Sequence, residues 1–224
     1  EIKSFPNVLQ YPENMRGKWN DFFKNKNKIV LELACGKGEY TLSLAKLFPK
    51  KNFIGIDIKG NRIWKGAKTA LADSLSNVAF LRIQIGMIEN YFSENEVSEI
   101  WLPFPDPQPR FSKMKKRLTH PAFLRKYQKI LQPGAFIHLK TDSPQLYFFT
   151  KKIIELFELD LLTDDGNIYS KNSLKKELKI KTHYEELDIA QSSRIHYLQF
   201  TLDKNLPDEK DEILKKICIE PAAD

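Results

Sequence analysis

Short apolar runs alternate with helical segments along most of this chain, and this alternation restricts its fold more than any other feature. The apolar runs are typical of buried strands and span residues 28–34, 52–58, 78–85, 97–102 and 135–141. The segments with helical spacing span residues 39–48, 61–76, 119–131 and 144–157. After residues 159–163 the pattern weakens, and an alternating strand follows at residues 195–202. Strands separated in this way predict βαβ crossovers and a mostly parallel sheet.

The composition fits one globular domain with a polyanionic partner. The chain has 224 residues, 42% of them hydrophobic and 29% charged, and a net charge of +7. No apolar run approaches the ~18 residues of a membrane span, and residues 1–27 lack the features of a secretory signal. Cys35 and Cys218 are too few and too distant for a disulfide framework or a zinc site. We therefore expect a cytoplasmic protein with no membrane attachment and no bound metal.

A glycine-containing loop follows the first apolar run and opens the first helical segment. It spans residues 32–38 with the sequence ELACGKG, and Gly36 and Gly38 permit positive φ and close approach of a nucleotide. Asp57 ends the second strand about 20 residues later, where an acid can accept hydrogen bonds from both hydroxyls of a ribose. Together the loop and the acid predict a nucleotide site, whereas either alone is compatible with a tight turn or a solvated strand end.

The same loop distinguishes two classes of enzyme that share this architecture. A dinucleotide site has the pattern G-x-G-x-x-G and sets a helix N-terminus against a pyrophosphate. Here Ala34 occupies the first glycine position, and no third glycine follows. Glu32 would repel a pyrophosphate, but it suits the cationic sulfonium and amino groups of S-adenosylmethionine. The loop therefore favours a methyltransferase over a dehydrogenase, and a turn without a ligand stays open.

A proline-rich loop with a basic tail follows the fourth strand. Its sequence is PFPDPQP at residues 103–109, and the four prolines restrict φ around Asp106. Ligands of open α/β sheets bind at the carboxyl ends of the strands, so a rigid acid here is a candidate for holding a target base. Residues 110–117 add five cations in eight positions, which is typical of a phosphate-binding edge. Each feature alone could be plain surface, but their adjacency favours a functional site.

The order of these motifs resembles the bacterial tRNA (guanine-N7-)-methyltransferase family over roughly residues 28–202. The motifs are ExxCGKG, GIDIK, FPDPxPR with its basic run, HLKTD and TxYE, and the FPDP loop with its basic tail is the most specific. The resemblance implies an α/β, Rossmann-like class I methyltransferase fold, with a mostly parallel seven-stranded sheet and helices on both faces. It also implies S-adenosylmethionine as cofactor and tRNA as partner, usually methylated at guanosine 46 of the variable loop.

The resemblance further assigns roles to individual residues. Asp106 would be the catalytic residue and would contact both cofactor and guanine. The other cofactor-binding residues would be Glu32, Gly36, Gly38, Asp57 and Gln84. The guanine pocket would consist of Arg110, Asp142, Thr182, His183, Tyr184 and Glu185. The RNA-binding residues of the basic run would be Lys113, Lys115, Lys116 and Arg117.

Three positions depart from the family pattern. Gln108 stands where the family has tryptophan, Gln84 where it has Asp or Asn, and Ser192-Ser193 where it has glycine. Two other functions therefore stay open. One is a methyltransferase of the same fold that acts on a small molecule, and the other is a non-catalytic tRNA-binding protein with a degenerate pocket.

The chain divides into three expected segments. Residues 1–27 would contact RNA or cover the sheet, residues 28–202 would form the methyltransferase domain, and residues 203–224 would form a peripheral helix or a frayed tail. Within the domain, residues 166–179 are polar and are expected to form a long loop or a small insertion. The sequence is compatible with a monomer or a homodimer.

Methylation at guanine N7 needs no general base, because N7 carries a lone pair and no proton. We expect an in-line displacement in which alignment of nucleophile, methyl and sulfur can supply ~7–11 kcal/mol. A nearby carboxylate would favour the cationic product. The histidines are then not needed for catalysis, and His138 and His196 are expected to be packed within strands. Trp64, Trp101 and Tyr127 are expected to lie in the core.

Overall fold

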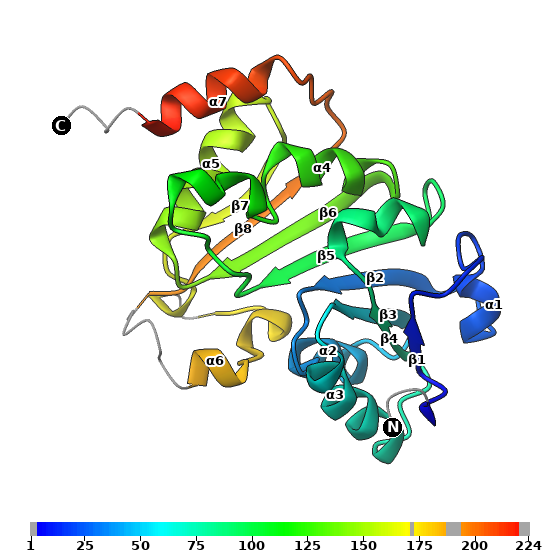
Figure 1. Ribbon diagram of the computed structural model, residues 1–224. Coiled ribbons are helices and arrows are strands. Elements are labelled where there is room, and N and C mark those ends of the chain that lie inside the picture. Colours follow the sequence, from blue (N-terminus) through cyan, green and yellow to red (C-terminus); the bar gives the residue numbers. More distant parts are fainter. Residues whose placement is uncertain (1–3, 171–172, 187–193, 220–224) are drawn as a thin grey trace.

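The computed structural model describes residues 4–170, 173–186 and 194–219, which form a sheet covered by helices on both faces (Figure 1). The strands are β1 (Val8–Gln10), β2 (Lys28–Leu33), β3 (Lys51–Asp57), β4 (Val78–Arg82), β5 (Val97–Pro103), β6 (Leu131–Thr141), β7 (Leu161–Asp165) and β8 (His196–Thr201). The helices are α1 (Trp19–Phe23), α2 (Glu39–Leu47), α3 (Gly60–Ala72), α4 (Pro121–Gln128), α5 (Pro144–Leu156), α6 (His183–Glu186) and α7 (Lys210–Ile219). Short 3₁₀ helices span Ile85–Asn90, Phe111–Lys116, Ile168–Ser170 and Lys176–Lys179.

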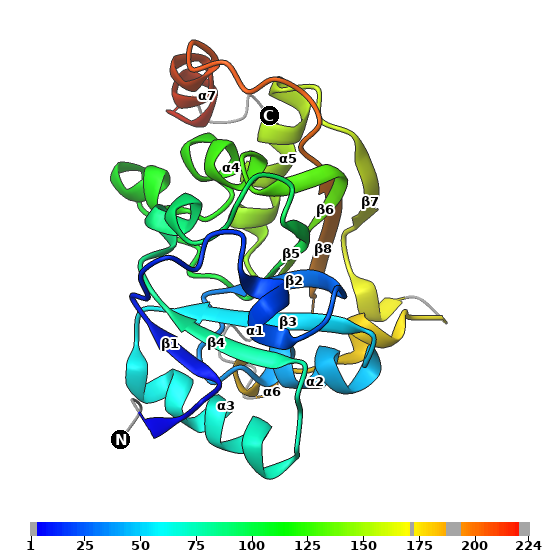
Figure 2. The same ribbon diagram turned by 90° about the vertical axis from the view of Figure 1, so that its right-hand side faces the viewer.

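The strand order β1-β4-β3-β2-β5-β6-β8-β7 confirms the mostly parallel α/β fold. The antiparallel pairs are those that β8 makes with β6 and β7. In the described part of the chain the sheet has eight strands where seven were expected, because Val8–Gln10 pairs with β4 as an added edge strand. Figure 2 shows β1 and β7 at opposite edges. Since the chain reverses its direction across the sheet between β2 and β5, the carboxyl ends of these two central strands flank the usual ligand crevice of open α/β sheets.

Each face of the sheet has its own apolar core. One core is built by α1, α4, α5 and α7, through side chains such as Trp19, Tyr127, Phe149 and Leu214. The other is built by α2 and α3, and buried Ile168 and Leu178 from residues 166–179 join it. The polar segment at residues 166–179 therefore covers the sheet through two apolar anchors. Its residues 171–172 are outside the described part.

Several local expectations are confirmed and two need correction. Trp101 and Tyr127 are in the core, and His138 and His196 are buried within strands. Trp64 is only half-buried, with Phe5 packed against it, so its core placement was wrong. The helix expected at residues 119–131 ends at Gln128, because Leu131 already pairs with Val97 as the start of β6.

The two ends of the chain also pack on this body. Trp19 of α1 is fully buried, and its indole N–H donates to the carbonyl of Tyr91 at 2.9 Å. At the other end, α7 packs on α5, and Arg125 of α4 forms an ion pair with Asp211 at 2.7 Å. Among the described residues, no helix is long and apolar enough to cross a membrane.

Candidate cofactor and substrate site

The loop between β2 and α2 is bent by residues with positive φ. Ala34, Gly36 and Gly38 have φ angles of 58°, 56° and 71°. Glycine is needed at Gly38 for a second reason, because a Cβ atom there would lie 2.4 Å from Cε1 of Phe80. At Gly36 an added Cβ would meet nothing within 4 Å. The loop thus packs against the sheet through Gly38 and faces open space at Gly36.

Asp57, at the end of β3, holds this loop in place. One of its carboxylate oxygens accepts the N–H of Gly36 at 2.9 Å, and the other accepts the N–H of Lys59 at 2.8 Å. The residue spacing that predicted a nucleotide site therefore places the acid and the glycine loop in direct contact.

Glu32 is buried beneath the first turn of α2, with 5% of its surface exposed. Its Oε2 accepts the backbone N–H of Thr41 at 2.7 Å and also the Thr41 hydroxyl. The carboxylate thus satisfies a donor at the positive end of a helix. Burial raises the pKa of Glu32 to about 8, because the loss of hydration outweighs these hydrogen bonds. An acid of this kind would be stabilised in its ionised form by a cation bound beside it.

A pocket opens beside Glu32, and segments far apart in the sequence meet in it. Its walls are formed by Glu32, Cys35, Gly36, Lys37, Glu39, Arg62, Pro103, Phe104, Thr182 and His183. The last two are fastened to α2, because a carboxylate oxygen of Glu39 accepts the N–H of His183 at 2.9 Å. The glycine loop, the start of the proline-rich loop and the segment at residues 182–183 therefore converge.

Asp106 lies on the proline-rich loop, two residues beyond the pocket wall at Phe104. Its side chain is exposed, and its Oδ1 accepts the N–H of Gln108 at 3.0 Å. Phe104 and Gln108 have positive φ angles of 51° and 44°. Such conformations cost of order 1–3 kcal/mol each and persist only where the surroundings enforce them. A strained, supported turn therefore presents Asp106 next to the pocket.

Arg117 provides part of this support, and its predicted role in RNA binding is wrong. Only 4% of its surface is exposed. Its Nε donates to the carbonyl of Pro107 at 3.1 Å, its Nη2 donates to the carbonyl of Gln108 at 3.2 Å, and its guanidinium stacks on Phe149. A guanidinium that is buried and bonded in this way is not available to a phosphate.

The other cations of the basic run face solvent. Phe111–Lys116 forms a 3₁₀ helix that is anchored by the buried side chain of Met114. Lys113, Lys115 and Lys116 are exposed on it, and Arg110 is exposed immediately before it. These four side chains form a basic edge that continues from the Asp106 loop.

Lys140 is a buried residue of the site to which the sequence assigned no role. Its side chain has no exposed surface, and its Nζ lies 2.8 Å from Oε2 of Glu185. The Nζ also donates to the carbonyls of Leu178 and Ile180, at 3.2 and 2.7 Å. Lys140 thus ties β6 to the segment that carries the pocket residues at 182–183. Its position inside the apolar run AFIHLKT was a usable signal, because lysine is almost never fully buried unless it is paired.

The remaining predicted substrate residues surround the same edge of the sheet. One carboxylate oxygen of Glu185 accepts a hydrogen bond from Lys140, and the other accepts one from the Tyr169 hydroxyl. Thr182 is buried, and its Oγ1 accepts the N–H of Glu185 at 3.3 Å. Asp142 is half-buried at the carboxyl end of β6, directly before Ser143, whose hydroxyl caps α5.

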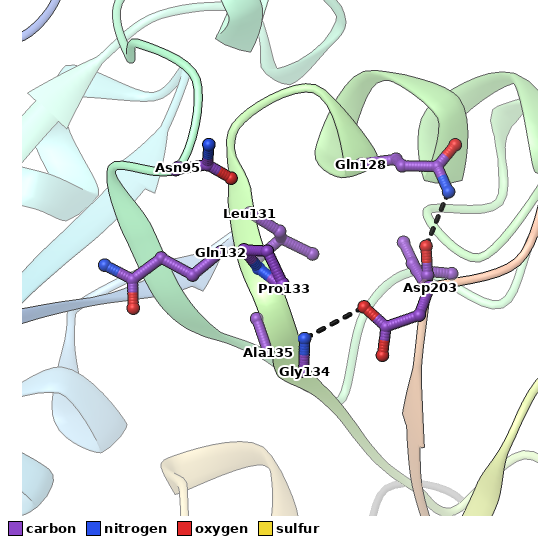
Figure 3. A pocket seen from close by; sticks show the side chains of 9 residues that line it. Asn95, Gln128, Leu131, Gln132, Pro133, Gly134, Ala135 and Asp203 are labelled. Carbon is purple, nitrogen blue, oxygen red and sulfur yellow. Dashed lines mark hydrogen bonds between the residues drawn. The ribbon is translucent and has the colours of Figure 1, made fainter.

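A second hollow lies at the other end of β6, away from all of these motifs (Figure 3). It is lined by Asn95, Gln128, Leu131, Gln132, Pro133, Gly134, Ala135, Leu202 and Asp203. As the dashed lines show, Asp203 accepts the N–H of Gly134, and Gln128 donates to the carbonyl of Leu202. Since none of the predicted site residues line it, the pocket beside Glu32 is the candidate site.

Comparison with known proteins agrees with this geometry. Residues 26–198 match a family described as putative methyltransferases. The chain is 49% identical over 215 residues to the tRNA (guanine-N(7)-)-methyltransferase of Porphyromonas gingivalis, covering 90% of this chain and 86% of that protein. A protein of the same name from Christiangramia forsetii is 45% identical over 212 residues, covering 90% and 95%. The chain belongs to the tRNA (guanine-N(7)-)-methyltransferase family.

Solved structures confirm the methyltransferase fold of this family member. A 30S ribosomal A1408 methyltransferase from an uncultured bacterium aligns with a TM-score of 0.61 and 15% identity, covering 85% of this chain and 95% of that one. A SAM-dependent methyltransferase from Aquifex aeolicus aligns with a TM-score of 0.54 and 15% identity, covering 82% and 87%. At these identities the likeness concerns the fold alone.

Two departures from the pattern of the tRNA (guanine-N(7)-)-methyltransferase family can be placed. Gln84 is exposed after β4 and begins the 3₁₀ helix Ile85–Asn90, and it is not a wall of the pocket. Gln108 is half-buried, and its backbone completes the turn around Asp106. The third departure, Ser192-Ser193, lies outside the described residues. Of Tyr184 the structure describes only the backbone, within α6.

Proposed function

We propose that this protein transfers the methyl group of S-adenosylmethionine to N7 of a guanine in tRNA. Its relatives are named for methyl transfer to this atom of tRNA. The observation that carries the proposal is the meeting of three segments at one pocket: the loop beside buried Glu32, the strained loop that presents Asp106, and residues 182–183. A basic edge continues from the second of these. A buried acid suits a cationic methyl donor, and an exposed basic edge suits a polyanionic acceptor.

In this proposal the cofactor is held by Glu32, the loop at Gly36 and Gly38, Asp57 and Gln84. S-adenosylmethionine supplies a methyl group on a positively charged sulfur, from which a neutral nitrogen can displace it. The Glu32 carboxylate compensates cationic charge inside the pocket. Asp57 lies against Gly36, where it can accept hydrogen bonds from ribose hydroxyls. Gln84 offers an amide to the adenine end of the cofactor.

The guanine is held by acids that position it and need not remove a proton. Asp106 is the catalytic residue, because an exposed carboxylate on a rigid turn can accept hydrogen bonds from the guanine and stabilise the positive charge that develops on it. The residues that complete the guanine pocket are Arg110, Asp142, Thr182, His183, Tyr184 and Glu185. Lys140 already pairs with Glu185, so we assign the larger electrostatic effect to Asp106.

The tRNA is bound through its phosphates by Lys113, Lys115 and Lys116, and its target is guanosine 46 of the variable loop. The three ammonium groups are exposed on one 3₁₀ helix, so they can follow a single stretch of the RNA backbone. We place the protein in the cytoplasm, where this substrate is made, as a monomer or homodimer.

Two titrations separate this proposal from its alternatives. Calorimetry should show S-adenosylmethionine binding. The affinity for unmodified tRNA should fall steeply with salt: a plot of log affinity against log salt concentration should have a slope of about −0.9 per phosphate contacted. A rate of methyl transfer to a small molecule that does not change when tRNA or salt is added would indicate a small-molecule methyltransferase. Binding of tRNA without binding of S-adenosylmethionine would indicate a degenerate pocket, and either outcome contradicts the proposal.

Glu32 makes cofactor binding depend on pH. In the protein without cofactor, the Glu32 carboxyl has a pKa of about 8. A bound cation favours its ionised form, so cofactor binding below that pH releases a proton. The affinity for S-adenosylmethionine should therefore rise with pH below about pH 8, by up to about tenfold per unit, and then level off. Calorimetric titrations from about pH 6 to 9 measure this change.

Glu32→Gln is the matched control for that experiment. Its amide oxygen can still accept the hydrogen bonds from Thr41, but it carries no titratable charge. The variant should bind S-adenosylmethionine more weakly at pH 8 and should lack the rise in affinity, so that its profile reports only the cofactor's own titration. Parallel profiles for wild type and variant would show that Glu32 does not face the cofactor cation.

A further inference from the structure

A groove with exposed aromatic rings lies behind the Asp106 loop, outside the cofactor pocket. This aromatic groove is lined chiefly by Phe111, Arg117, Gln145, Phe148, Phe149 and Lys152. Phe148 exposes 56% of its surface and Phe111 exposes 41%. Both rings come from elements next to the site, since Phe148 is on α5 and Phe111 opens the 3₁₀ helix of the basic edge. Two large apolar side chains exposed in one groove indicate a binding surface.

The floor of the aromatic groove also supports the Asp106 loop. The guanidinium of Arg117 lies 4.4 Å from the ring centroid of Phe149 and donates to two carbonyls of that loop. Gln145 donates to a third loop carbonyl, at 3.0 Å. A ligand in the groove would therefore contact Arg117 and Gln145, the two side chains that donate hydrogen bonds to the Asp106 loop.

The charges around the aromatic groove favour an anionic ligand. Lys152 lines it, and Lys113 and Lys116 are exposed on the same 3₁₀ helix as Phe111. No Asp or Glu is among the described residues that line the groove. Aromatic faces next to cations are the combination that binds single-stranded nucleic acid, because bases stack on the rings while phosphates pair with the cations.

We propose that the aromatic groove binds a nucleotide next to the methylated guanine of the tRNA, with its base stacked on Phe148 and Phe111. This inference rests on the proposed function, which places the guanine at Asp106. Enzymes that act on a base take it out of its stack, so a neighbouring base loses a stacking partner. The phenylalanine rings replace that partner. Stacking of this kind accounts for about 5- to 150-fold in affinity per base.

The test is a binding titration of unmodified tRNA over a range of salt concentrations. Phe148→Ala and Phe111→Ala should each weaken binding by about fivefold or more, and the double variant should weaken it further. The salt dependence should stay as in wild type, because no charge is removed. Lys113→Ala removes a charge, so it should instead make the slope of log affinity against log salt concentration less negative by about 0.7–0.9.

Two further variants serve as controls. Phe148→Trp keeps a stacking surface and should restore wild-type affinity. Leu162→Ala removes a side chain that is 51% exposed on edge strand β7, and it should leave tRNA binding unchanged.

Three results would overturn the role of the groove. The first is wild-type tRNA affinity in the double variant. The second is an equal loss of S-adenosylmethionine affinity in calorimetry, which would mean that the Asp106 loop had collapsed. The third is a wild-type protein that sediments as a dimer and a double variant that sediments as a monomer, because the groove would then be the interface with a second copy of this chain. Wild-type protein that binds tRNA without methylating it would contradict the proposed function. The role of the groove is tested separately, by the ratio of the tRNA affinity of wild type to that of the phenylalanine variants.

Discussion

Replacing Asp106 with alanine should lower the rate of methyl transfer to tRNA by about 10²–10³-fold, the range typical of removing one preorganised electrostatic group from an active site. Asp106 is exposed, and the hydrogen bond it accepts from Gln108 closes only a local turn. The variant should therefore unfold at nearly the wild-type temperature. Single-turnover rates with saturating cofactor, together with a thermal melt, measure both effects. A wild-type rate in Asp106→Ala would remove the central role of this residue.

Asp106→Asn separates the charge of this side chain from its part in the turn. The amide oxygen can still accept the hydrogen bond from the Gln108 N–H, so the strained loop should keep its shape. Because the charge is gone, we expect most of the rate loss seen in Asp106→Ala. Recovery of the wild-type rate in Asp106→Asn would show instead that Asp106 acts only by shaping the loop.

Replacing Lys140 with methionine should destabilise the protein by about 3–5 kcal/mol, because it leaves the largely buried Glu185 without its cation. For a chain of this size such a loss lowers the unfolding midpoint by about 6–20 °C. Two carbonyls of the covering segment, those of Leu178 and Ile180, also lose their donor. Thermal unfolding followed by circular dichroism measures the effect.

The double variant Lys140→Met/Glu185→Leu is the control for that effect. Replacing both members of a buried ion pair with apolar side chains is often neutral, so most of the lost stability should return. Methyl transfer by the double variant should stay below the wild-type rate, because Glu185 belongs to the proposed guanine pocket. A single variant Lys140→Met that melts at the wild-type temperature would contradict the structural role of the pair.

The core of the fold could be predicted because its signals are local. The apolar runs and the alternating segment at residues 195–202 identified six strands, β2–β6 and β8, and the helical spacing identified the main helices. The parallel topology then set the motif loops at one edge of the sheet. Val8–Gln10 could not be found in this way, because three residues show no period and become a strand only by pairing with β4. The end of α4 was misplaced for a similar reason, since a long-range pair with Val97 makes Leu131 a strand residue.

The site was predictable as a set of motifs, but the roles of its buried cations were not. Within the basic run, Arg117 differs from the lysines because it follows the 3₁₀ helix in an extended conformation, and its guanidinium donates to the carbonyls of Pro107 and Gln108. These are contacts with the preceding loop that the local pattern of the run does not show. Lys140 lies on a strand buried on both sides, where Ile137 and Leu139 face one core. Alternation therefore does not distinguish it. Its position inside an apolar run indicates a buried and paired lysine, but the structure was needed to identify Glu185 as the partner.

The most direct test is nucleoside analysis of an unmodified tRNA transcript after incubation with this protein and S-adenosylmethionine. We expect 7-methylguanosine in the tRNA, none of it with Asp106→Ala over the same short incubation, and none in a transcript that carries adenosine at position 46. Methyl groups found only on another atom, another base or a small molecule, or no transfer by a protein that binds both cofactor and tRNA, would contradict guanine-N7 methylation as the function.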